Sequence, residues 1–171
     1  MIEIYQGSSN QDLFIAQWWA KIQTNGELKM TFSSNCYALS GFFSLFQKPN
    51  VLTFDVDQKG LWFAAWFEPV MSSAFMGLWV DKRKRGTISS WKNFERVVSE
   101  GLSNFSSIMG VTKQEKLVAQ HKKIGYTELG VIPGIFDGED GFILLLTKEA
   151  WERRSIGKTR KQEVAIASGG V

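Results

Sequence analysis

The chain has 171 residues, of which 44% are hydrophobic and 22% are charged, which is typical of one globular domain with a single sizeable core. No apolar run approaches the roughly 20 residues of a membrane span, and the N-terminus lacks the pattern of a secretory signal, so we expect a cytoplasmic protein with no membrane partner. With one cysteine and one histidine, we expect neither an intramolecular disulfide nor a metal site.

The positive charge is concentrated at the C-terminus. The formal net charge is +3, and all of this excess lies in residues 148–171, because basic and acidic residues balance over residues 1–147. The pattern predicts a domain at 1–147 followed by a basic C-terminal helix and a flexible tail. Such a tail either binds nucleic acid or an acidic partner, or stays solvated; we favour the solvated tail and do not expect nucleic-acid binding.

The first half of the chain predicts a strand and two helices. Residues 2–5 alternate as a strand does, and Ser8 is a suitable residue to cap a helix. Apolar residues then recur three and four positions apart over 15–22 and again over 39–46, which indicates two amphipathic helices. We expect the first helix to end near Gly26 and the second before the next proline.

Strands dominate the middle of the chain. Residues 51–56, 61–67 and 73–80 are rich in aromatic and β-branched side chains, and 57–60 is typical of a turn. These residues predict an antiparallel meander.

The second half predicts helices alternating with strands. Apolar periodicity indicates a helix over 88–102, and 106–110 is a short strand candidate. Thr112 and Glu115 have the spacing of a capping box, so a further helix is expected to begin there and to end at Gly125. Two strands, at 126–131 and 141–147, are expected to follow, joined by a turn-rich connection at 133–140.

The basic turn between the third meander strand and the next helix predicts a phosphate site. A helix N-terminus offers unpaired main-chain N–H groups and the positive end of its dipole, and Gly86 allows an anion to approach the backbone. Arg83, Lys84 and Arg85 would add charge-assisted hydrogen bonds. The alternative interpretation of this basic run is a solvated loop.

The element order and this turn resemble the GNAT acyltransferase superfamily. In that superfamily the fourth strand leads into a turn of the form Arg/Gln-x-x-Gly-x-Gly/Ala, which wraps the pyrophosphate of acetyl-coenzyme A. Arg83 and Gly86 match the first two defining positions, whereas Ile88 replaces the small residue expected at the third. The resemblance implies an α/β (α+β) fold with a twisted, mostly antiparallel mixed sheet of six to seven strands and four helices.

The resemblance also implies where acetyl-coenzyme A would bind. The pantetheine arm would hydrogen-bond to the strand backbone near Leu78 and Val80, between two strands that splay apart. The pyrophosphate would be held by the turn and the start of the helix, at Arg83, Lys84, Arg85, Gly86, Thr87, Ile88 and Ser89. The acceptor would contact the variable residues 24–35 and 132–140.

A second stretch, residues 114–126, is similar to the superfamily's fourth helix. The typical pattern is Asn-x-x-Ala-x-x-x-Tyr-x-x-x-Gly-Phe; the ending Gly125-Tyr126 fits, while Gln114 and Leu117 replace the usual Asn and Ala. His121 stands where the superfamily places the tyrosine that protonates the departing thiolate. An imidazole can donate that proton. The alternative is a packing or partner-contact role on an apolar helix face.

Further polar residues carry two interpretations each. Glu68 and Asp81, at the ends of predicted strands, are candidates for the base that takes the amine's proton, or are ordinary strand ends or caps. Cys36 either pairs with His121 as a nucleophile or, as we favour, is a buried structural thiol.

Three functions fit the sequence. The first is an N-acetyltransferase that moves an acetyl group from acetyl-coenzyme A directly to a small-molecule or protein amine. The second is a catalytically degenerate GNAT-fold interaction protein, such as a phage virion-associated protein, with a protein partner or a second copy. We favour core packing for most aromatic residues, but some of those beyond what a small sheet face buries would suit such a contact surface; the candidates are Phe42, Phe43, Phe46, Trp62 and Trp66. The third is a nucleic-acid-binding module that uses the tail.

Overall fold

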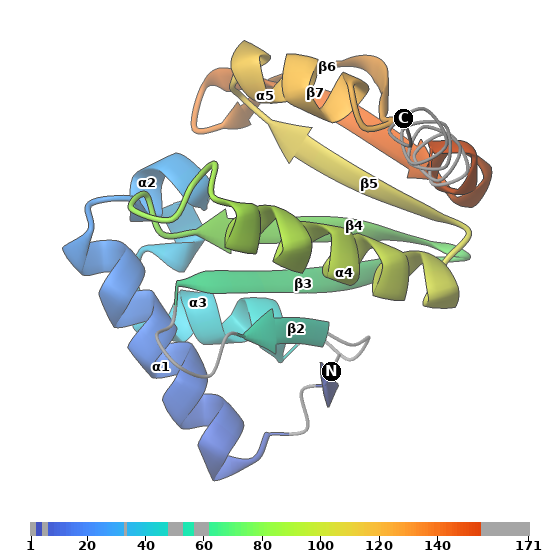
Figure 1. Cartoon of the computed structure of the whole chain (residues 1–171). Coiled ribbons are helices and arrows are strands. Elements are labelled where there is room, and N and C mark those ends of the chain that lie inside the picture. The colour runs from blue at the N-terminus through green and yellow to red at the C-terminus, as the bar shows by residue number, and fades with distance from the viewer. Residues whose placement is uncertain (1–2, 5–6, 33, 48–52, 57–61, 155–171) are drawn as a thin grey trace, which may run out of the picture.

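The computed structural model describes residues 3–4, 7–32, 34–47, 53–56 and 62–154 (Figure 1). The strands are β1 Glu3–Ile4, β2 Thr53–Val56, β3 Phe63–Val70, β4 Ser73–Val80, β5 Ser107–Thr112, β6 Thr127–Phe136 and β7 Glu139–Thr147. The helices are α1 Ser9–Thr24, α2 Leu28–Thr31, the short 3-10 helix η1 Ser34–Cys36, α3 Leu39–Phe46, α4 Ile88–Asn104 and α5 Glu115–Lys122. Residues 148–154 are also helical.

The strands form one sheet in the order β1-β2-β3-β4-β5-β7-β6. Neighbouring strands are antiparallel except β4 and β5, which are parallel. The predicted mixed, mostly antiparallel fold and the β2–β3–β4 meander are therefore confirmed; the predicted turn at 57–60 lies outside the described residues. None of the helices in the described part of the chain has the length and apolar composition needed to cross a membrane.

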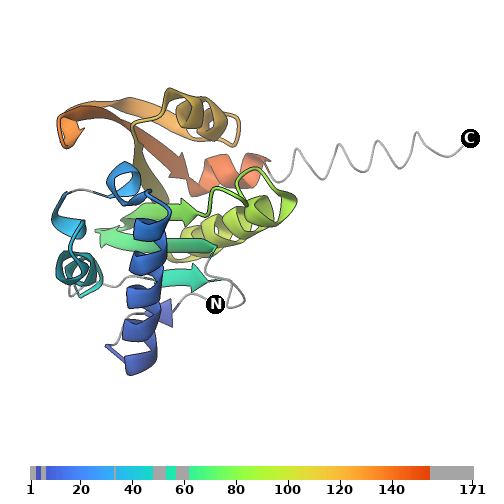
Figure 2. The same cartoon turned by 90° about the vertical axis from the view of Figure 1, so that its left-hand side faces the viewer.

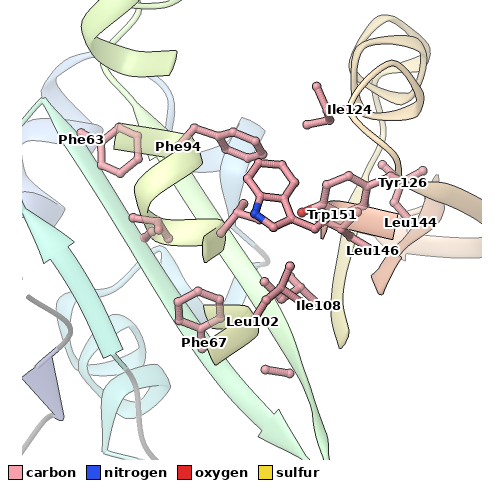
Figure 3. Close-up of a cluster of buried hydrophobic side chains, with 14 of the residues drawn as sticks. Phe63, Phe67, Phe94, Leu102, Ile108, Ile124, Tyr126, Leu144, Leu146 and Trp151 are labelled. Atoms are coloured by element: carbon pink, nitrogen blue, oxygen red, sulfur yellow. The ribbon is translucent and has the colours of Figure 1, made fainter. Parts of the chain in front are cut away.

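Helices cover both faces of the sheet, and each face has its own core. Figure 2 shows α1 and α3 on one side of β3 and β4, with α4 on the other. Side chains alternate along β3, so that Phe63, Ala65 and Phe67 join the core beneath α4 and α5, while Ala64 and Trp66 join the core beneath α1 and α3. We call these the α4 core, shown in Figure 3, and the α1 core.

The aromatic residues are mostly inside. In the α1 core, Trp18 is fully buried and lies within 6.5 Å, between ring centroids, of the rings of Phe14, Phe32, Phe42, Phe46, Trp66 and Trp79. Trp62 is partly buried against the α4 core. Core packing, the favoured interpretation, is therefore confirmed for Phe42, Phe46 and Trp66, and Phe43 packs against the same core. The contact-surface alternative is wrong for the three buried rings, because α3 turns Phe42 and Phe46 inward against α1 and Trp66. Cys36 is buried in the same core, as expected.

Most predicted helix ends agree with the structure. Ser8 caps α1 in a capping box with Gln11, and Gly125 has φ +103°, as a residue that ends a helix often does. The predicted Thr112–Glu115 capping box is wrong. Thr112 remains paired in β5, and its hydroxyl accepts a hydrogen bond from the N–H of Gln114, the N-cap residue, instead of from the first turn of α5.

Two connections also differ from their prediction. Residues 24–35 contain the short helices α2 and η1, so the described residues hold more helices than the four predicted. The predicted connection at 133–140 is mostly strand, because β6 and β7 pair out to Phe136 and Glu139 and leave a tight turn at Asp137.

Helix 148–154, beyond the predicted domain boundary, contributes the buried Trp151 to the α4 core (Figure 3). The predicted tail after it lies outside the described residues.

Candidate functional site

The parallel strands β4 and β5 stay paired over only part of their length. Their register joins Ser73 to Ser107, Ala74 to Ile108 and Phe75 to Met109, and pairing ends there although β4 continues to Val80. Figure 1 shows the two strands diverging beyond this point. The edge of β4 that faces β5 is therefore unpaired over its last residues.

Main-chain groups of Leu78 and Val80 lie along this unpaired edge. The N–H of Asp81 donates to the carbonyl of Trp62 on the β3 side, at 2.7 Å. Because successive residues of a strand direct their peptide groups to opposite edges, Leu78 and Val80 direct theirs toward β5. The residues predicted to bind a pantetheine arm thus offer main-chain groups where the strands separate.

After β4 the chain turns through residues 81–87 into α4, and we call this turn the donor corner, after the role that the sequence predicts for it. Gly86 has φ +74°, a conformation that glycine adopts without strain. A Cβ placed on Gly86 would have no atom within 4 Å, and Ile88 is 77% exposed, so the bulk of Ile88 does not fill the space beside Gly86. The corner is open on this side.

Several main-chain amides of the donor corner are free. The N–H groups of Arg83, Lys84 and Thr87 bond within the turn, and the Thr87 hydroxyl caps α4 by accepting from the N–H of Ser90. Among the described residues, no hydrogen bond is made by the N–H groups of Lys82, Arg85 and Gly86 in the corner, or by those of Ile88 and Ser89 at the start of α4. Free amides at the N-terminus of a 17-residue helix suit an anion.

Both arginines of the corner already have acidic partners. Arg83 donates through Nε and Nη2 to the two carboxylate oxygens of Asp81, at 3.1 and 2.7 Å. Arg85 donates through Nη2 to Glu27 Oε1 at 2.6 Å, and through Nε to the carbonyl of Val80 at 2.9 Å. Arg83 and Arg85, which we expected to pair with phosphate, therefore also stabilise the turn through these contacts. Lys84, between them, is exposed.

Asp81 is buried at the base of the corner. Its carboxylate accepts from Arg83 and lies 3.8 Å from the Lys21 ammonium. Hydrogen bonding to Arg83 holds the pKa of Asp81 well below its usual range, although burial opposes the shift. Since a carboxylate with a lowered pKa is a weaker base, this geometry favours the cap interpretation of Asp81 over the catalytic one.

Glu68 lies opposite Phe75, one strand away from the point where β4 and β5 separate. Alternation along β3 places it on the face of Ala64 and Trp66, beneath α1 and α3. Glu68 is half-buried. It is thus on the sheet face opposite to α4, and nearer to the divergence than to the donor corner.

His121 packs on α5 between aromatic rings. Its Nδ1 lies 2.7 Å from the carbonyl oxygen of Leu117, which can only accept, so Nδ1 carries the hydrogen. Its ring meets Tyr126 edge-on at 5.0 Å and Phe94 at 6.1 Å. Burial lowers the pKa of His121, although the hydrogen bond to Leu117 opposes this effect. A neutral imidazole whose N–H is engaged offers a lone pair rather than a proton, and this favours the packing interpretation.

Tyr126, next to His121, has a buried hydroxyl with no hydrogen-bond partner among the described residues. Figure 3 shows its ring among Trp151, Leu144 and Leu146. Burial raises the pKa of Tyr126 strongly, so its phenol stays protonated at neutral pH.

We expect Tyr126→Phe to stabilise the protein, because an unsatisfied buried hydroxyl costs roughly 1–3 kcal/mol. Urea denaturation should show a free energy of unfolding about 1 kcal/mol higher than in the wild type. Tyr37→Phe is the matched control, since the Tyr37 hydroxyl donates to Asp137 at 2.7 Å and its removal should bring no gain. Loss of stability in Tyr126→Phe would mean that the hydroxyl has a partner, such as a buried water.

The two regions expected to contact an acceptor lie next to each other. The hydrogen bond from Tyr37 to Asp137 joins the chain after η1 to the β6–β7 turn, 100 residues away. The same carboxylate also interacts with Ser34 of η1, and these hydrogen bonds lower its pKa.

Comparison with known proteins gives structural neighbours only. No protein-family model matches this sequence, and no curated protein matches it. Spermidine N-acetyltransferase from Vibrio cholerae, in a complex with CoA and spermine, superposes with a TM-score of 0.65 at 12% identity over 88% of this chain and 97% of its own. The ribosomal-protein-alanine N-acetyltransferase of Brucella melitensis gives 0.63 at 10% identity, over 86% of this chain and 99% of its own. A putative phosphinothricin N-acetyltransferase gives 0.62 at 17%, over 86% of this chain and 98% of its own.

The chain therefore has the fold of the GNAT N-acetyltransferases, as its element order predicted. These neighbours, each of low sequence identity, establish the fold and do not support a phage origin. Sequence reasoning found the donor corner and missed Glu27, which lies 58 residues from Arg85 and carries no local signal of this contact.

Proposed function

We propose that this protein is an N-acetyltransferase that transfers an acetyl group from acetyl-coenzyme A to an amine. One observation carries the proposal: an open corner with free main-chain amides adjoins two diverging parallel strands in a GNAT fold. Among its structural neighbours, the Vibrio cholerae enzyme was solved with CoA and spermine. A cationic amine is accordingly the first acceptor class to test.

The corner has the chemistry that a pyrophosphate requires. The N–H groups of Arg85, Gly86, Ile88 and Ser89 would donate to phosphate oxygens, and the dipole of α4 favours negative charge there. The side chain of Thr87 caps α4 and so stabilises the geometry of this helix end. The exposed Lys84 would supply positive charge without giving up an internal partner, and Arg83 and Arg85 would contribute through the field of their bound guanidinium groups.

The unpaired edge of β4 would hold the pantetheine arm. The amide groups of the arm need main-chain partners, which the N–H and carbonyl of Leu78 and the N–H of Val80 would offer, since the Val80 carbonyl already accepts from Arg85. The side chains of Leu78 and Val80 pack toward the α4 core. The thioester supplies an activated acyl carbon, to which the amine nitrogen bonds as the carbon–sulfur bond breaks.

Two protons must move in this reaction, one from the amine and one to the sulfur. Glu68 is our candidate for the base, because it lies on the sheet face beneath α1 and α3, beside the divergence. For the acid, His121 remains a candidate only if it is protonated, and its lowered pKa makes that form scarce at neutral pH. We therefore expect catalysis to depend more on positioning than on a strong acid.

Calorimetry with coenzyme A and an assay of acetyl transfer to spermine and to small primary amines test this function. We expect saturable binding at micromolar to submillimolar concentrations and release of free thiol that depends on the amine. An absence of binding up to millimolar coenzyme A would refute the proposal.

A further inference from the structure

Glu27 is a buried carboxylate to which the proposed function gives no role. It lies between α1 and α2 and is only 5% exposed. Its Oε1 accepts from Arg85 Nη2 at 2.6 Å, and its Oε2 accepts from Trp79 Nε1 at 3.1 Å. A buried carboxylate is stable only when it is paired and hydrogen-bonded, and both of its oxygens have partners here.

The partners of Glu27 connect it to both sides of the donor corner. Trp79 lies near the end of β4, before the turn, and Arg85 lies just before Gly86. Arg85 also donates to the carbonyl of Val80, so its guanidinium is fixed between Glu27 and the end of β4. The position of the Arg85 backbone, and of the amides that follow it, thus depends on a residue from the N-terminal helices.

A second contact braces the start of the same turn. Lys21, in the last turn of α1, lies 3.8 Å from Asp81, which holds Arg83 through both carboxylate oxygens. Opposite charges therefore alternate from the end of α1 into the turn. The Lys21 contact is long and partly exposed, whereas Glu27 is buried, so we assign the larger effect to Glu27.

We propose that Glu27 is a positioning residue for donor binding, which holds Arg85 against the end of β4 so that the amides of the corner stay ordered and open. The inference rests on the proposed function for its ligand. It also links the acceptor side of the fold to the donor side, because Glu27 belongs to the expected acceptor region, residues 24–35. Glu27 itself needs no contact with either substrate.

Glu27→Gln tests this inference. The amide oxygen can still accept from Trp79, but the charge that holds Arg85 is lost. We expect the Kd for coenzyme A, measured by calorimetry, to rise about tenfold, as the loss of one charge-assisted hydrogen bond predicts. Hydrogen exchange should become faster at the hydrogen-bonded amides of the turn, those of Arg83, Lys84 and Thr87. Glu128→Gln is the matched control, because Glu128, on β6 and away from the corner, pairs with Lys122 at 2.6 Å. The affinity of this variant for coenzyme A, and the exchange rates of its turn amides, should equal those of the wild type.

The two measurements separate this inference from the proposed function. Unchanged exchange at the amides of Arg83, Lys84 and Thr87 in Glu27→Gln overturns the positioning role, whether or not coenzyme A binds. Faster exchange with unchanged affinity overturns its importance for the donor. If the wild type itself fails to bind coenzyme A, the proposed function is refuted, while the hydrogen-exchange comparison still shows whether Glu27 orders the turn. Should Glu27→Gln fail to fold, Glu27→Gln/Arg85→Met removes both charges of the pair, so that no partner is left uncompensated, and wild-type affinity in that folded variant would overturn the inference.

Discussion

Gly86→Asp is expected to bind coenzyme A about 100-fold more weakly than Gly86→Asn, because a carboxylate a few ångströms from a pyrophosphate costs roughly 3 kcal/mol at the effective dielectric constant of a protein surface. The space beside Gly86 is empty, so neither side chain would clash. Both asparagine and aspartate tolerate a positive φ better than other residues with a Cβ, and φ is +74° here. The two variants therefore differ in charge at nearly equal shape and strain.

Calorimetry and thermal denaturation together test this prediction. Both variants should unfold within a few degrees of each other, since the residue is exposed, while only Gly86→Asp should lose donor affinity. Raising the salt concentration should narrow the difference, because the repulsion is electrostatic. Equal affinities for the two variants would show that no anion binds at this corner, and would remove the main support for the proposed function.

Gly77→Ala is expected to lower the free energy of unfolding by about 3 kcal/mol, because the added methyl group has no room. Gly77 lies opposite Trp66 in the β3–β4 register, and a Cβ there would be 1.9 Å from the indole ring. The ring cannot move aside easily, since Trp18 and Phe32 pack against it with centroids 5.4 Å away. The cost is thus one of overpacking in the α1 core.

Gly110→Ala is the matched control for this substitution. Gly110 lies on β5, facing β4 where the strands diverge, and the nearest atom to its added Cβ is the Met76 carbonyl oxygen at 4.0 Å. We expect its stability to change by less than about 1 kcal/mol. Urea denaturation of both variants gives the comparison, and Trp66→Phe should reduce the cost of Gly77→Ala if the ring is the obstacle. A Gly77→Ala protein as stable as the wild type would contradict the packing described here.

Local signals explain why much of the fold was predictable. Apolar residues recur along α1, α3 and α4 with the period of a helix, and period-two or apolar runs mark β2, β3 and β4. Short-range contacts decide such elements, so the sequence near each one is sufficient. The turn at residues 81–87 was also recognisable, because a basic turn with Gly86 directly before a capped helix is a local pattern; donor binding there is our proposal.

Errors arose where a distant strand changed the outcome. Thr112 looks like the first residue of a helix, but pairing with Phe142 keeps it in β5. Residues 133–136 look like a turn because of Pro133 and Gly134, yet β6 pairs with β7 again at Phe136 and Glu139, beyond an irregular stretch, and this pairing extends the strand. In both cases a partner far along the chain outweighed the local preference, and no single stretch of sequence contains that information.

The sequence by itself determined most element types, their order and the place of a basic, glycine-containing turn before a capped helix, since these depend on periodicity, capping and glycine conformation within a few residues. The tertiary structure alone decided what the charged residues do. Asp81 and Glu27 are buried against Arg83 and Arg85, and His121 donates within its own helix. A side chain's protonation and availability depend on which groups surround it in space, and for Glu27 those groups come from 52 and 58 residues away.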